Sequence, residues 1–112
     1  MQVRILGCSG GIGQQVITSS YLVDDDILLD AGTGVGDLPL DEMRKIKHIF
    51  ITHSHMDHVV TIPLLIDTLF SDIKQPVIVH ALQDTIDALK THVFNWTIWP
   101  DLRFYRPNRT LC

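Results

Sequence analysis

The pattern of apolar and polar positions near the start of the chain predicts three short strands. Residues 2–8 alternate and are rich in β-forming side chains, which is typical of a strand with one buried face. Residues 20–23 and 27–30 are short apolar runs, and the three aspartates between them fit a hairpin turn. We favour a solvated turn here over calcium binding, because the spaced ligands and the glycine of a calcium loop are missing.

After residue 30 the pattern alternates between helices and strands. The predicted elements are a short helix at 41–45 capped by Asp41, a strand at 48–52, a helix at 59–70, a strand at 76–80 and a helix at 83–94. The helix at 59–70 is apolar on nearly every face, which predicts burial on several sides. The last helix is amphipathic, with an apolar stripe at Leu82, Ile86, Leu89 and Val93. This order of elements indicates an α/β fold.

Composition narrows the class of protein. The 112 residues are 46% hydrophobic and 20% charged, which predicts one globular domain over residues 1–112. The net charge of −4 argues against sequence-specific nucleic-acid binding through phosphate neutralisation. No apolar run is long enough to span a bilayer and no signal-peptide pattern opens the chain, so we expect no membrane partner and a cytoplasmic location. Cys8 and Cys112 are expected to be free thiols.

The densest chemistry lies directly after the predicted strand at 48–52. Three of the six histidines and an aspartate fall within six residues: His53, His55, Asp57 and His58. Histidines two apart on an extended segment point the same way, and imidazole and carboxylate are zinc ligands. The carboxyl end of a strand is also where α/β sheets place their sites. The clustering of these residues at the end of a strand favours a metal site over surface histidines. Four donors exceed what one catalytic metal usually takes from one loop, so the pattern favours two metals over one.

The run His53-Ser54-His55-Met56-Asp57-His58 resembles the HxHxDH motif of the metallo-β-lactamase superfamily. Residues 6–11, 29–34 and 51–70 are similar to the class II cyclic-nucleotide phosphodiesterases within it. The likeness extends to about Asp101, leaving residues 102–112 as a tail. It implies the N-terminal half of an αββα sandwich, one mixed sheet with helices on one face. The other face would be uncovered, so we expect the chain to expose apolar surface and self-associate.

The resemblance also implies roles for single residues. His53 and His55 would bind the first metal, Asp57 and His58 the second, and Asp57 is also counted as catalytic. Asp30 resembles a carboxylate that supports a ligand from the second shell by accepting a histidine N–H, although a plain turn residue explains it equally well. The cofactors would be two divalent ions, with zinc expected and manganese or iron as alternatives. They would activate water to hydrolyse a phosphodiester such as a 3′,5′-cyclic nucleotide.

The later ligands of that family have no counterpart in this chain. We interpret His48, His80 and His92 as residues that bind no metal, and Asp101 lacks the context of a bridging ligand. The alternatives are therefore an active metallo-hydrolase, of which this chain is a fragment, and an inactive truncated remnant with weak or no metal binding. An RNA-processing or thioester-hydrolysing relative is a further possibility for the substrate.

The first glycine-rich run offers a competing function. Gly7, Gly11 and Gly13 fit a spacing found in NAD(P)-dependent short-chain oxidoreductases. Residues 14–23 are predicted to be loop and then strand, so no helix would present its N-terminus to a pyrophosphate. We therefore prefer a flexible turn that contacts the rim of the metal pocket.

Overall fold

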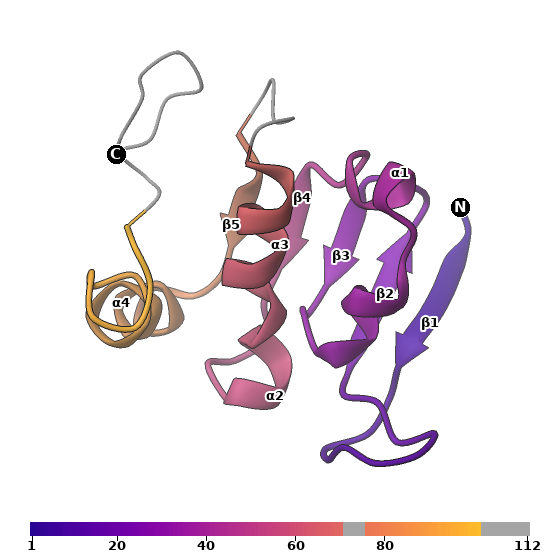
Figure 1. The fold of residues 1–112 in the computed structure, drawn as a ribbon, viewed down its shortest axis with the longest axis horizontal. Coiled ribbons are helices and arrows are strands. Elements are labelled where there is room, and N and C mark those ends of the chain that lie inside the picture. The colour runs from indigo at the N-terminus through magenta and orange to yellow at the C-terminus, as the bar shows by residue number, and fades with distance from the viewer. Residues whose placement is uncertain (71–75, 102–112) are drawn as a thin grey trace.

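One mixed five-stranded sheet organises the fold (Figure 1). This computed structural model describes residues 1–70 and 76–101, so the predicted tail at 102–112 lies outside the described residues. The strands, in the order β1-β2-β3-β4-β5 across the sheet, are Val3–Gly7, Ser20–Val23, Ile27–Leu29, His48–Phe50 and Ile78–His80. β1, β2 and β3 pair antiparallel, whereas β3, β4 and β5 pair parallel. The predicted α/β class and mixed sheet are confirmed.

The helical elements follow the predicted order with two changes. They are the 3-10 helix η1 (Thr33–Asp37), α1 (Leu40–Met43), α2 (Met56–Val59), α3 (Thr61–Leu69) and α4 (Gln83–His92). η1 occupies most of the second glycine-rich run, and Gly34 permits its approach to β1, since a Cβ there would overlap the carbonyl oxygen of Leu6. The single helix expected at 59–70 is two helices, and the first begins inside the histidine run. None of the helices in residues 1–70 and 76–101 is long and apolar enough to cross a membrane.

The core lies between one face of the sheet and the helices in front of it, α3 among them (Figure 1). Leu22, Leu28 and Ile49 face this core from neighbouring strands. The buried side chains of α3 are Thr61, Ile62, Leu65 and Leu69, which form one stripe along the helix. Leu64 is 52% exposed, so the prediction of a helix buried on several sides is wrong.

The opposite face of the sheet, which we call the open face, carries two rows of mainly apolar side chains. Side chains alternate along a strand, so the residues next to the core positions point the other way. By register the rows are Val3, Val23, Ile27, His48 and Ile78, and then Ile5, Tyr21, Leu29, Phe50 and His80. Val3, Ile5, Leu29, Phe50 and Ile78 are all exposed, so the expectation of an uncovered apolar face holds for the described part of the chain.

Candidate metal centre

The parallel pairing of β3 and β4 brings two distant segments to one edge of the sheet. Asp30 follows β3, and residues 53–58, which we call the histidine segment, come shortly after β4. Asp30 N–H donates to the carbonyl of Phe50 at 2.7 Å, and Ala31 N–H donates to the carbonyl of His58 at 2.7 Å. These backbone bonds hold the histidine segment against the end of β3.

Within the histidine segment, the four residues expected to bind metal are neighbours in space. The ring of His53 lies 4.7 Å from that of His55 and 4.1 Å from that of His58, measured between centroids. Nε2 of His58 faces Oδ2 of Asp57 at 3.3 Å. Across residues 1–70 and 76–101, however, no three side chains of the ligating types are arranged to hold an ion. The segment gathers suitable donors without preassembling a site, and their role as ligands stays a prediction.

Asp30 is the buried anchor of this arrangement, with only 4% of its surface exposed. Its carboxylate accepts hydrogen bonds from the Thr52 N–H at 2.8 Å, from the Thr52 hydroxyl at 2.9 Å and from Nδ1 of His58 at 2.8 Å. Its backbone is left-handed, with φ of 57°, a conformation that aspartate tolerates in turns. Asp30 is therefore both a turn residue and a hydrogen-bond partner of a histidine ring, and its role as the support of a metal ligand stays a prediction.

The hydrogen bonds of the rings test whether these residues suit a metal. Nδ1 of His58 is bound to Asp30, and Nδ1 of His53 lies 2.9 Å from the Thr52 hydroxyl. Metal-binding histidines commonly use one nitrogen for the ion and give the other to such an outer partner. With Nδ1 engaged in both rings, Nε2 of each is the nitrogen that would coordinate, and Nε2 of His58 lies 3.3 Å from Oδ2 of Asp57, the residue expected to share its ion. The donor chemistry therefore fits zinc and similar divalent ions.

The first glycine-rich loop borders the histidine segment, at the same edge of the sheet (Figure 1). A Cβ placed on Gly10 would lie 4.0 Å from Oδ2 of Asp57, so the loop passes close to the histidine segment, while its contact with a metal pocket stays a prediction. The loop is pinned at its base, where the N–H groups of Cys8 and Ser9 both donate to the carbonyl of Ile17. Residues 8–19 contain bridges and turns but no helix, so the dinucleotide-binding alternative finds no support.

The three remaining histidines lie elsewhere. On the open face, Nδ1 of His48 lies 2.9 Å from Nε2 of His80, and Phe50 stacks on His80 with ring centroids 4.3 Å apart. His92 is exposed at the end of α4. Their engagement with one another and with solvent agrees with the interpretation that none of them is a ligand, which itself stays a prediction.

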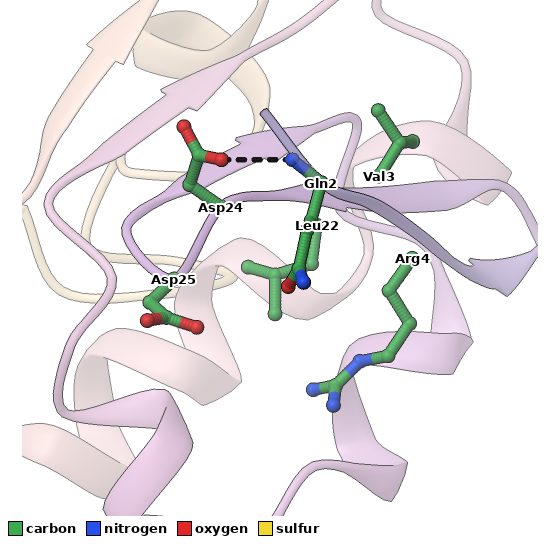
Figure 2. A pocket seen from close by; sticks show the side chains of 6 residues that line it. All are labelled: Gln2, Val3, Arg4, Leu22, Asp24 and Asp25. Carbon is green, nitrogen blue, oxygen red and sulfur yellow. Dashed lines mark hydrogen bonds between the residues drawn. The ribbon is translucent and has the colours of Figure 1, made fainter.

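Two cavities are lined by residues outside the histidine segment. The first, of about 310 Å³, lies where β1 begins and β2 ends, at the opposite end of the sheet from Asp30 (Figure 2). There Gln2 N–H donates to Asp24 at 2.9 Å, and Arg4 pairs with Glu42 of α1, a hydrogen bond that raises the pKa of Arg4. The second, of about 340 Å³, lies between η1, α1 and α3. Neither includes a residue expected to bind metal.

Comparison with known proteins decides the family. A model of the class-II cAMP phosphodiesterases matches residues 40–110, which is more than half of the chain and includes the histidine segment. The chain belongs to the class-II cAMP phosphodiesterase family. The resemblance drawn from the HxHxDH run is thereby confirmed, and the matched range extends past Asp101 into the segment expected to be a tail.

Similar proteins include phosphodiesterases and a ribonuclease Z. A probable 3′,5′-cyclic-nucleotide phosphodiesterase of Yersinia pestis is 30% identical over 89% of this chain and 36% of its own length. A ribonuclease Z of Halorubrum lacusprofundi is 33% identical over 80% of this chain and 31% of its own length. The crystal structure of unliganded yeast PDE1 matches with a TM-score of 0.69 and 21% identity, over 93% of this chain and 47% of that one. The chain thus shares that fold and spans about a third of the curated relatives' length.

Thr52 lies in the candidate site, although sequence reasoning gave it no role. Its hydroxyl contacts both Asp30 and His53. The available signal was its place at the end of the predicted strand, directly before the first histidine. Its partner Asp30 is 22 residues away in the chain, and only the strand pairing brings the two together.

Proposed function

We propose that this chain supplies part of the active site of a two-metal phosphodiesterase that hydrolyses 3′,5′-cyclic nucleotides. The observation that carries the proposal is the hydrogen bond from Nδ1 of His58 to the buried Asp30. His58 belongs to the histidine segment, and the family model of the class-II cAMP phosphodiesterases covers that segment. Such a bond fixes the tautomer and orientation of a histidine for metal binding. The Yersinia pestis relative, named for this substrate class, supports the choice of a cyclic nucleotide.

Each residue of the site has a definite part in this proposal. His53 and His55 would hold one divalent ion, Asp57 and His58 would hold the other, and Asp30 would orient His58. Two bound ions would supply Lewis-acid chemistry at this site, which lowers the pKa of water and offsets charge on phosphoryl oxygens. The positive charge of the pair also draws a phosphodiester anion to a protein of net charge −4. Zinc is the expected metal, with manganese and iron as alternatives, and the expected location is the cytoplasm.

Metal counting combined with turnover tests this proposal on the 112-residue chain. After loading with zinc, manganese or iron and removal of free metal, we expect about two ions per chain and hydrolysis of cyclic AMP or bis-p-nitrophenyl phosphate that a chelator abolishes. No bound metal would support the inactive remnant instead. Cleavage of an RNA substrate without cleavage of cyclic AMP would move the substrate class toward that of the ribonuclease Z relative.

We also propose that the chain self-associates through the open face. The two rows are mainly apolar and their only ionisable side chains are Tyr21, His48 and His80, so two copies can stack without opposing fixed charges.

The variant Ile5→Lys tests this association, because it places a charge on the open face at a side chain that is 64% exposed and so spares the core. We expect it to shift the chain toward monomer in light scattering coupled to gel filtration. Leu82→Lys, at an exposed site off the sheet, is the matched control. A wild-type chain that is monomeric at high concentration would refute the proposal.

A further inference from the structure

The hydroxyl of Thr52 lies between a carboxylate and a histidine ring. Its Oγ1 is 2.9 Å from Oδ2 and 3.1 Å from Oδ1 of Asp30, and 2.9 Å from Nδ1 of His53. A hydroxyl has one hydrogen to donate and two lone pairs with which to accept, whereas an ionised carboxylate only accepts. The Thr52 hydrogen therefore goes to Asp30, and Oγ1 must accept a hydrogen from Nδ1 of His53.

The direction of these hydrogen bonds connects both His53 and His58 to the Asp30 carboxylate. Asp30 also accepts directly from Nδ1 of His58 at 2.8 Å. The ring of His53 is then held with hydrogen on Nδ1 and a lone pair on Nε2 through the Thr52 hydroxyl. The ring of His58 donates from Nδ1 to the same carboxylate without an intermediary, and its Nε2 lies 3.3 Å from Oδ2 of Asp57. The two rings also lie 4.1 Å apart between centroids, so their orientations are set together.

The backbone of Thr52 fixes the position of its hydroxyl. The Thr52 N–H donates to Oδ1 of Asp30 at 2.8 Å, which gives the residue a second attachment to the same carboxylate. This attachment does not involve the side chain, so it survives substitution of Thr52. Because Thr52 is itself exposed while Asp30 is buried, loss of the hydroxyl creates no cavity in the core.

We propose that Thr52 is a positioning residue that links His53 to the Asp30 carboxylate by hydrogen bonds. Its hydroxyl donates to Asp30 and accepts from Nδ1 of His53, and we call this link the relay. A single buried carboxylate then sets the tautomer of one histidine for each of the two metals, since His53 belongs to the first ion and His58 to the second. The assignment of the two ions rests on the proposed function, whereas the tautomer of His53 does not depend on it. Thr52 touches no substrate in this scheme and acts only through His53.

The tautomers are measured first in the metal-free chain, by nitrogen-15 NMR of the histidine rings at a pH where they are neutral. In the wild type we expect Nδ1 of both His53 and His58 to carry the hydrogen. Thr52→Val should convert His53 to a mixture with hydrogen on Nε2 and leave His58 unchanged, while Thr52→Ser should restore the wild-type state. Thr52→Ala repeats the test without the branched side chain.

Zinc binding is measured next, by competition with a chelator. We expect Thr52→Val to weaken the ion held by His53 and His55 by about tenfold or more and to leave the other nearly unchanged. An unaltered His53 tautomer in both Thr52→Val and Thr52→Ala, or a serine variant that behaves like valine, would overturn the relay. A wild type that binds no zinc but shows the expected tautomers would keep the relay and reject the proposed function.

Discussion

Replacing Asp30 with asparagine is expected to lower the zinc affinity of the chain by about 10- to 100-fold, as is typical when the outer partner of a metal-bound histidine is lost. The amide has nearly the same shape, and asparagine tolerates the left-handed backbone at this position. Its NH2 group, however, donates where the carboxylate accepts. One of the present donors, the Thr52 N–H, the Thr52 hydroxyl or Nδ1 of His58, therefore loses its acceptor.

The same substitution should also destabilise the metal-free chain. These hydrogen bonds are partly buried, and leaving one donor without an acceptor costs up to about 1–3 kcal/mol, which urea unfolding without zinc can detect. Zinc affinity measured by chelator competition gives the separate effect on the metal. Asp84→Asn makes the same chemical change at an exposed position in the first turn of α4 and should alter neither quantity. Wild-type zinc affinity in Asp30→Asn would show that Asp30 serves the turn alone.

Local pattern located all five strands because each is a short run rich in β-forming residues. β2 has the predicted bounds, and the other four strands are shorter than predicted by one or two residues at one or both ends. The start of the helix after β4 was harder to place, since residues 56–58 carry no apolar period. Their helical turn is held by a bond from His58 N–H to the carbonyl of His55 and by the bond from Ala31 N–H to the carbonyl of His58. The second of these depends on a segment that is distant in sequence.

The apolar stripe of α4 shows a different limit of pattern reasoning. Leu82 was placed on the stripe by spacing, yet it is 76% exposed, whereas Thr85 is buried beside Leu89. The reason is local, because Leu82 is the residue before the helix and has an extended backbone. Its side chain therefore does not follow the helical period. Apolar spacing located the helix correctly and misplaced the first residue of its buried face.

The candidate site divides in the same way between local and distant information. The four donors of the histidine segment are adjacent in sequence, so their spacing alone indicated a metal site. The outer partners are not adjacent: Asp30 and Thr52 meet only because β3 and β4 pair in parallel. Sequence left Asp30 undecided between a turn and a support. Its backbone forms the turn and its carboxylate contacts the His58 ring, while its support of a metal ligand stays a prediction. The sequence could not predict which groups the Thr52 hydroxyl donates to and accepts from, because these partners come together only in the fold.

Removing two imidazoles from the histidine segment should have the largest effect of any change to this chain. In the double variant His53→Ala/His55→Ala we expect the bound zinc to fall from about two ions to one or fewer, because both proposed ligands of the first ion are gone. Metal stabilisation of charge in hydrolysis is worth several kcal/mol, and about 1.4 kcal/mol is a factor of ten. Hydrolysis of a phosphodiester should therefore drop by at least about 100-fold.

The open face offers a matched control for this loss. His48→Ala/His80→Ala removes the same number and type of side chains from a pair whose rings contact each other rather than the histidine segment. We expect this control to keep its zinc and its hydrolytic rate, with far-ultraviolet circular dichroism confirming that both variants are folded. Equal metal content in the two variants would refute the ligand assignment. Loss of zinc in the control alone would move the metal to the open face, because the pair of imidazoles there would then be the ligands.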